Sequence, residues 1–184
     1  SRVTFGKDFF KVSISNNSEV IQEFISNWFN DMKIQHKIYT KHTVGTSTDN
    51  QGYSSLLAKF MLKLVGNNSR TKHIPYESYN SPDEFIIGLL NGYFSGDGYI
   101  SNNSIEVSSA SFELIEGISF LLSRLGIFSK ISKSQLKENN FKTNDIAPSH
   151  RLTVRSKYAK IFSNKIELIH SNKQMKLDKL NQNL

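Results

Sequence analysis

The chain contains no cysteine, so neither a disulfide nor a cysteine-ligated metal site can form. Proline is scarce, with three among 184 residues. The longest apolar stretch, residues 85–90, is far shorter than the roughly 20 residues of a membrane-spanning helix. No basic segment followed by an apolar one marks the N-terminus as a secretory signal. We therefore expect no membrane contact and an intracellular protein, cytoplasmic or, in a eukaryote, nuclear.

Acidic residues are fewer than basic ones. The chain has 23 Lys and Arg against 16 Asp and Glu, which gives a formal net charge of +7. Apolar residues make up 38% of the chain and aromatic residues 11%, which is enough for a packed core. A basic chain of this kind suits nucleic acid or another polyanion as its partner. An ordinary globular protein with a positive surface fits the composition equally well.

The hydrophobic pattern repeats along the chain. Apolar residues alternate at Val12 and Ile14 and then recur at helical spacing over residues 20–29. A shift of 93 residues places Val12 on Ile105 and Ile14 on Val107, and a second helical period follows over residues 114–125. The repeat predicts two α/β halves related by a pseudo-twofold.

Polar stretches separate these elements. Residues 45–52 and 137–149 are rich in turn-forming or polar residues, and we expect loops there. A further strand is predicted over residues 151–155, and a last helix over residues 158–169.

The most informative segment is residues 81–98, which begins with the pattern of a helix N-terminus. Ser81 is the expected N-cap, Pro82 the first helical residue, and Glu84 the partner in a capping box.

Three glycines, Gly88, Gly92 and Gly96, then follow four residues apart on one helical face. Each costs up to roughly 1 kcal/mol relative to alanine inside a helix. A second helix that packs closely against the bare backbone would offset this cost. The alternative is a helix that ends near Tyr93, with Gly96 and Gly98 as ordinary turn residues.

Asp97 would lie at the C-terminal end of such a helix, where the dipole favours cations. A divalent metal held partly by a free carbonyl oxygen would stabilise a carboxylate there. The alternative is a solvent-exposed Asp-Gly turn.

Residues 89–98 resemble the dodecapeptide motif of LAGLIDADG homing endonucleases, in the form found in intein-encoded enzymes. Gly92, Gly96 and Asp97 match the motif's glycines and its metal-binding acid, whereas Ser95 replaces an earlier acid. Residues 72–75 resemble the K-x-I-P block of inteins, and residues 108–111 and 125–127 are also similar to the family.

This resemblance implies an α+β fold of two pseudo-twofold-related halves, each with an antiparallel DNA-binding sheet. Residues 1–80 would form an incomplete N-terminal half that begins after the first motif, and residues 81–184 the half with the dodecapeptide helix. The first motif helix is expected to be absent. The chain could then be one piece of a split protein, a trimmed form or a degenerate copy.

The resemblance also implies site-specific cleavage of double-stranded DNA by metal-assisted hydrolysis. Mg²⁺ would bind Asp97 and the carbonyl of Gly96, Lys72 would polarise water, and Arg151 would occupy the place of a second lysine. Activity would need the missing motif. A second chain would supply it, or the chain would self-associate through the glycine face.

DNA contacts are expected on the polar faces of the strands, where basic residues meet phosphates and polar residues read base edges. The expected residues are Lys11, Ser13, Lys37, Tyr39, Lys41, Lys130, Ser132, Thr153 and Arg155. Each face could instead be an ordinary solvated surface. The alternative functions are a non-cleaving DNA- or RNA-binding module, maturase-like or degenerate, and a basic interaction protein.

Overall fold

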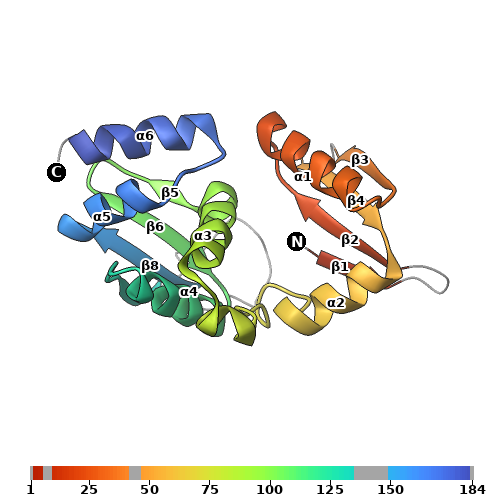
Figure 1. The fold of residues 1–184 in the computed structure, drawn as a ribbon, viewed down its shortest axis with the longest axis horizontal. Coiled ribbons are helices and arrows are strands. Elements are labelled where there is room, and N and C mark those ends of the chain that lie inside the picture. Colours follow the sequence, from red (N-terminus) through yellow and green to blue (C-terminus); the bar gives the residue numbers. More distant parts are fainter. Residues whose placement is uncertain (1, 6–9, 42–46, 135–148, 183–184) are drawn as a thin grey trace, which may run out of the picture. The chain divides into compact units, whose positions relative to one another are not determined.

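The computed structural model describes residues 2–5, 10–41, 47–134 and 149–182. The chain divides into two compact units, Ser1–Asn68 and Ser69–Leu184 (Figure 1). Among the described residues, no helix is both long and apolar enough to cross a bilayer.

The first unit is an antiparallel sheet in the order β1-β2-β4-β3 with two helices. Its elements are β1 (Arg2–Phe5), β2 (Phe10–Ser15), α1 (Glu19–Asp31), β3 (His36–Lys41), β4 (Ser47–Tyr53) and α2 (Ser55–Val65). Helix α1 buries Ile21, Ile25 and Phe29. A Cβ atom at Gly52 in β4 would collide with the ring of Phe29, so this strand position requires glycine.

The second unit contains a sheet in the corresponding order, β5-β6-β8-β7, and again every pair is antiparallel. Its elements are the short 3-10 helix η1 (Tyr76–Asn80), α3 (Asp83–Asp97), β5 (Tyr99–Ile100), β6 (Ser104–Ser109), α4 (Phe112–Arg124), β7 (Lys130–Ser134), β8 (Ser149–Arg155), α5 (Lys157–Lys165) and α6 (Ser171–Gln182).

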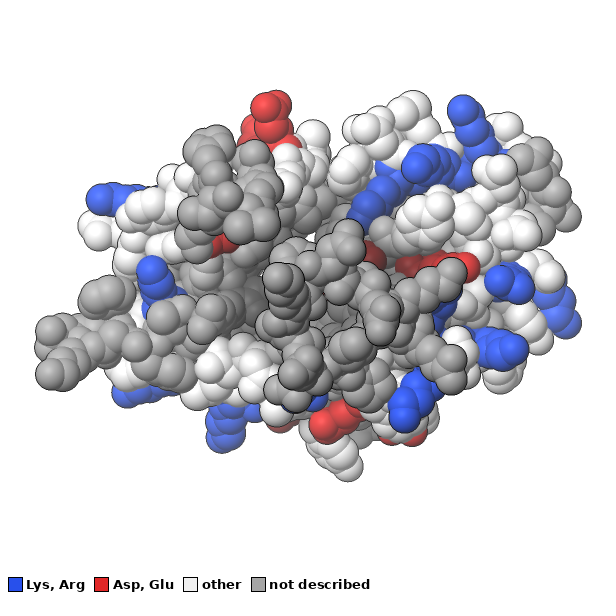
Figure 2. Space-filling model, turned by 180° about the vertical axis from the view of Figure 1, so that it is seen from behind, with Lys and Arg blue, Asp and Glu red and all other residues white. Residues whose placement is uncertain are grey.

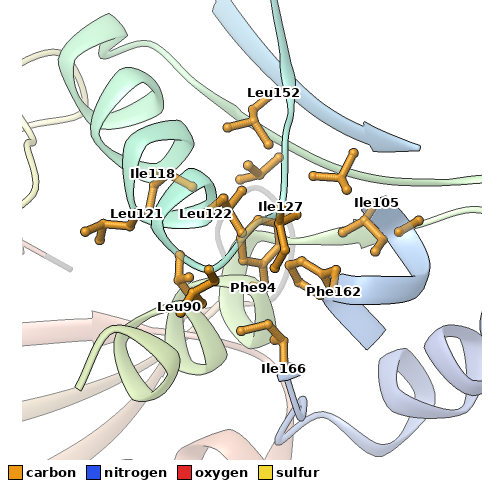
Figure 3. Close-up of a cluster of buried hydrophobic side chains, with 14 of the residues drawn as sticks. Leu90, Phe94, Ile105, Ile118, Leu121, Leu122, Ile127, Leu152, Phe162 and Ile166 are labelled. Carbon is orange, nitrogen blue, oxygen red and sulfur yellow. The ribbon is translucent and has the colours of Figure 1, made fainter. Parts of the chain in front are cut away.

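The core of the second unit fixes the orientation of α3. Leu90 and Phe94 are fully buried, and the ring of Phe94 lies edge-on to Phe162 of α5 with centroids 4.9 Å apart (Figure 3). Leu122 of α4 and Leu152 of β8 belong to the same buried cluster. One face of α3 therefore packs in the core, and the glycines of the helix lie outside this face.

The predicted mixed α/β fold with antiparallel sheets is confirmed, and the two sheets share one strand order. The expected loop over residues 45–52 is wrong, because β4 begins at Ser47. The predicted last helix is also wrong in extent. It is α5 alone, which ends at Lys165, and a separate helix, α6, begins at Ser171. Most of the predicted loop over residues 137–149 lies outside the described residues.

The segment before α3 packs with the second unit, although we expected a boundary between residues 80 and 81. Ile74 is buried in the core of that unit, and Ser111 Oγ donates to the Lys72 carbonyl over 2.6 Å. A Cβ atom at Gly117 of α4 would lie 2.6 Å from the Tyr79 hydroxyl, so glycine allows this close approach. The division accordingly falls between residues 68 and 69.

The N-terminus of α3 also differs from the expected capping box. Pro82 is the N-cap, and its carbonyl accepts from the backbone N–H groups of Phe85 and Ile86. Ser81 Oγ instead donates to the Glu77 carbonyl over 3.0 Å. Proline has no side-chain acceptor for the first N–H groups, so the reciprocal bonds of a capping box cannot form.

Candidate active site and nucleic-acid interface

Helix α3 continues through Gly96 and ends at Asp97, with Gly98 as its C-cap. The N–H of Gly98 still donates to the Phe94 carbonyl over 3.0 Å. A helix that ends near Tyr93 is therefore excluded. The carboxylate of Asp97 is exposed at the C-terminal end of α3.

The glycine face of α3, formed by Gly88, Gly92 and Gly96, is open. A Cβ atom built at each of the three would have no neighbour within 4 Å among the described residues. Gly88 and Gly92 are exposed. The bare backbone expected for close helix packing is present, and this face could accept a second helix.

Lys173 of α6 binds the C-terminal end of α3. Its ammonium group donates to the Ser95 and Gly96 carbonyls over 2.8 Å each. A cation is favourable there because the last carbonyls of a helix carry partial negative charge. Burial lowers the pKa of Lys173, and the nearby Asp97 carboxylate opposes that shift. We predicted a positive group at this position, but not that a lysine would supply it.

Two further contacts tie the segment before α6 to α3. The Ser95 hydroxyl, which is buried, accepts from the N–H of Ile169 over 2.8 Å, and Asn91 Oδ1 accepts from the N–H of Glu167 over 3.3 Å. Ser95 is the residue that replaces the earlier acid of the motif. In this chain its side chain is a structural anchor.

The oxygen donors at the end of α3 suit a hard divalent cation. Asp97 offers an exposed carboxylate and Gly96 a carbonyl oxygen, the ligand types that Mg²⁺ accepts. The Lys173 ammonium already donates to the Ser95 and Gly96 carbonyls, so these oxygens can accept from a cation. Among the described residues no group of three or more His, Asp or Glu could enclose a metal ion. The residues therefore fit part of a coordination shell.

Lys72 and Arg151 lie on different elements of the second unit. Lys72 is partly buried in the segment before η1, and its carbonyl is held by Ser111. Arg151 of β8 is exposed, and its guanidinium lies 3.7 Å from the Glu106 carboxylate. Within the described residues, neither side chain forms a hydrogen bond or ion pair with Asp97.

The polar sheet face of the first unit includes a strand that the sequence did not predict. Gln51 of β4 lies between Ser13 of β2 and Lys37 of β3, and it accepts from Lys11 Nζ over 2.8 Å. Ser13, an expected DNA contact, is buried, and so is Gln51. The hydroxyls of Tyr39 and Tyr53 lie 2.9 Å apart. Lys41 ends β3, and its side chain lies outside the described residues.

Because β4 was not predicted, two of its residues with functional groups were not recognised as part of the sheet. Gln51 and Asp49 were assigned to a loop because the segment of β4 is polar and contains Asn and Gly, which are depleted in strands. Asp49 is buried and accepts from the Ser15 hydroxyl over 2.6 Å. Because Asn50 between them is also polar, the segment has no polar–apolar alternation that could have indicated a strand.

The second sheet brings its predicted residues together. Lys130 of β7 pairs directly with Thr153 of β8, and Ser132 pairs with Arg151. Arg155 lies opposite Ser104 on β6. Figure 2 shows Lys and Arg groups spread over one face of the molecule, with Asp and Glu groups among them.

Comparison with known proteins supports the resemblance of the motif. The family model described as a LAGLIDADG-like domain matches residues 84–167, which run from the first turn of α3 to the segment after α5. A crystal structure of I-DmoI in complex with DNA and Ca has a TM-score of 0.63 at 15% identity, over 89% of this chain and 80% of that one.

Other solved structures share this fold. Full-length DUF199/WhiA from Thermatoga maritima has a TM-score of 0.62 at 16% identity, over 99% of this chain and 56% of that one. Complexes of I-DmoI with DNA have been solved with Ca, Mg or Mn, and I-DmoI is a homing endonuclease. At such identities the likeness establishes a fold of the LAGLIDADG type.

The curated relatives are much longer proteins. DNA-directed RNA polymerase subunit Rpo1C of Methanocaldococcus jannaschii is 35% identical over 172 residues, which are 92% of this chain and 18% of the relative. ATP-dependent DNA helicase Hel308 of the same organism is 32% identical over 165 residues, 84% of this chain and 14% of the relative. The chain thus spans less than a fifth of the length of either relative.

Proposed function

We propose that this chain is the endonuclease domain of an intein or of a split relative, and that it acts in site-specific, metal-assisted cleavage of double-stranded DNA. One observation carries the proposal: the exposed Asp97 carboxylate ends a helix whose glycine face is open to a partner. The polar sheet faces and the net charge of +7 support DNA as the substrate.

The relatives support an intein as the origin. Similar stretches of 172, 165 and 138 residues occur in an RNA polymerase subunit, a helicase and a replication factor C subunit. These proteins carry different names and activities, and the stretch occupies only 18%, 14% and 7% of their lengths. A mobile inserted element accounts for this recurrence, whereas a shared host activity does not.

The proposed chemistry assigns a role to each residue of the site. Mg²⁺ would be held by the Asp97 carboxylate and the Gly96 carbonyl, and when bound it supplies charge stabilisation and an activated water. Lys72 would polarise a water molecule beside the scissile phosphate. Guanidinium groups do not serve as bases in proteins, so Arg151 would stabilise phosphate charge.

A second motif helix would complete the site. Hydrolysis of two strands calls for a second acid beside Asp97, and the open face of Gly88, Gly92 and Gly96 offers the close packing that would bring it there. Another chain, another segment of the same protein or a second copy could supply this helix. We expect the 184 residues alone to cut DNA poorly.

A selection experiment tests the proposal. Duplexes bound by the chain would be selected from a randomised library, and strand cleavage of the selected duplex would be measured with Mg²⁺ and a peptide or chain that carries a second motif helix. The proposal expects a preferred duplex and cleavage only when the second helix is added. The absence of any preferred duplex, or efficient double-strand cleavage by the chain alone, contradicts it.

A non-cleaving nucleic-acid-binding module is the second candidate. Lys173 favours it, because this lysine already occupies the carbonyls at the end of α3. Selective DNA or RNA binding without cleavage, even with the second helix present, would identify this function.

A further inference from the structure

We propose that Lys173 is a built-in cation that competes with the divalent metal for the C-terminal end of α3. This inference rests on the proposed metal site at Asp97 and deepens it. Metal binding would then require the Lys173 ammonium to leave the Gly96 carbonyl. The chain would exist in two states, one closed by lysine and one open to metal.

Lys173 Nζ contacts three carbonyls of α3, those of Ser95 and Gly96 at 2.8 Å and that of Phe94 at 3.5 Å. The Phe94 carbonyl already accepts from the N–H of Gly98, whereas the other two have no backbone donor within the helix. In a continuing helix, the Ser95 and Gly96 carbonyls would accept from residues four positions later. Because α3 ends at Asp97, those later residues, Tyr99 and Ile100, belong to strand β5. One ammonium group, 2.8 Å from both oxygens, replaces the two missing backbone donors.

Lys173 is held in this place by its surroundings. Leu177 and Leu180 anchor α6 in the core with 0% and 1% of their surface exposed. The backbone N–H of Lys173 donates to the His170 carbonyl over 2.9 Å, and Ile169 is bonded to Ser95 of α3. The side chain is itself partly buried. These contacts distinguish Lys173 from an exposed lysine that samples many positions.

The Gly96 carbonyl is the point of competition. If the Lys173 ammonium stayed in place, a divalent cation bound to this oxygen and to Asp97 would lie beside it and share its acceptor. Two cations at one partly buried oxygen repel each other strongly, since little solvent screens them. Removal of the ammonium should therefore increase the affinity of this site for metal.

A Mn²⁺ titration of the full chain tests the competition without any cleavage assay. Paramagnetic broadening of the backbone amide signals of residues 96–99 would be followed by NMR in the wild type, in Lys173→Met and in Lys176→Met. Lys176 lies on the same helix and is exposed, so its variant is the matched control. We expect these amide signals to reach half of their maximal broadening at a lower Mn²⁺ concentration in Lys173→Met. This concentration should be about fivefold or more below the one that the wild type or Lys176→Met requires.

The outcomes separate this inference from the proposed function. Equal or higher Mn²⁺ requirements in Lys173→Met would overturn the competition and leave the metal site at Asp97 intact. No broadening near Asp97 in any of the three proteins would overturn both.

A measurement on the wild type covers the case in which Lys173→Met does not fold. Saturating Mg²⁺ should move the side-chain Hε signals of Lys173 towards those of Lys176. A shift at the Asp97 amide without one at Lys173 would refute the competition.

Discussion

Tyr93 lies one helical turn before Asp97 and carries a buried hydroxyl. This hydroxyl has no hydrogen-bond partner among the described residues. Burial raises the pKa of Tyr93 above the ordinary 10.0, and the Asp97 carboxylate raises it further. The folded chain therefore holds the hydroxyl proton more tightly than the unfolded chain does. The contribution of this group to the free energy of unfolding is fully present below pH 10.0 and is lost as the pH rises further.

Tyr93→Phe should therefore make the chain less sensitive to alkaline pH. Above pH 10.0, the free energy of unfolding should fall less in the variant than in the wild type. At neutral pH, the variant should have a free energy of unfolding about 1 kcal/mol higher, because a buried unsatisfied hydroxyl is removed. Urea denaturation at several pH values measures both effects. Tyr99→Phe, at an exposed position, serves as the control. Identical pH profiles for wild type and Tyr93→Phe would contradict the assignment.

The sequence predicted some of the site and could not predict the rest. Asp97 at a helix end implied a nearby positive charge, and that expectation was sound. Its source, Lys173, is 76 positions away in the sequence, and only tertiary packing of α6 against α3 brings the two together. No local pattern marks one lysine of α6 as different from its neighbours Lys176 and Lys179.

At the level of elements, the two sides of α3 differ. Ile86, Leu90 and Phe94 pack in the core with no exposed surface. A Cβ atom built at any glycine of the glycine face would meet no described residue within 4 Å. Among the described residues, no packing compensates for the glycines. Their low helix propensity therefore lowers the free energy of unfolding without an offset.

Gly92→Ala should consequently stabilise the isolated chain by roughly 0.5–1 kcal/mol. Gly117→Ala, a matched substitution in α4, should be destabilising, because its Cβ would lie 2.6 Å from the Tyr79 hydroxyl and 2.7 Å from Ile74 Cγ1. Thermal denaturation of the two variants measures the contrast. A loss of stability in Gly92→Ala would show that the glycine face is already covered.

The sequence did not predict β4, because its side chains are not of the types that favour β-strands. β4 contains Asp49, Asn50 and Gly52, so propensity alone indicates a turn. Pairing with β2 and β3 on both sides forms the strand, and Gly52 is required by the ring of Phe29. Helices α1 and α4 were predicted from their apolar periodicity, since each has a single buried face.

At the level of the whole molecule, the repeat of the pattern predicted two α/β halves, and the structure has two sheets with corresponding strand orders. Polar and basic residues line one face of each sheet. If both faces contact phosphates, binding to duplex DNA should weaken steeply with salt, because each neutralised phosphate releases counterions.

Single substitutions test whether the two sheet faces contact the DNA. Lys37→Gln and Lys130→Gln should each lower the slope of log K against log salt by about 1, in measurements of anisotropy with a labelled duplex. Lys63→Gln, on helix α2, should leave the slope unchanged. Equal slopes for all three variants would exclude the sheet faces as the DNA-binding surface.

Cleavage of a selected duplex by Asp97→Asn tests the central claim most directly. The substitution keeps the shape of the side chain and removes the charge that would hold the metal. In a protein that carries both motif helices, the wild type should cut both strands with Mg²⁺. Asp97→Asn should bind the same duplex in EDTA with nearly unchanged affinity and leave the DNA uncut. If Asp97→Asn cuts at the wild-type rate, Asp97 is only a turn residue and the chain has no nuclease site at the end of α3.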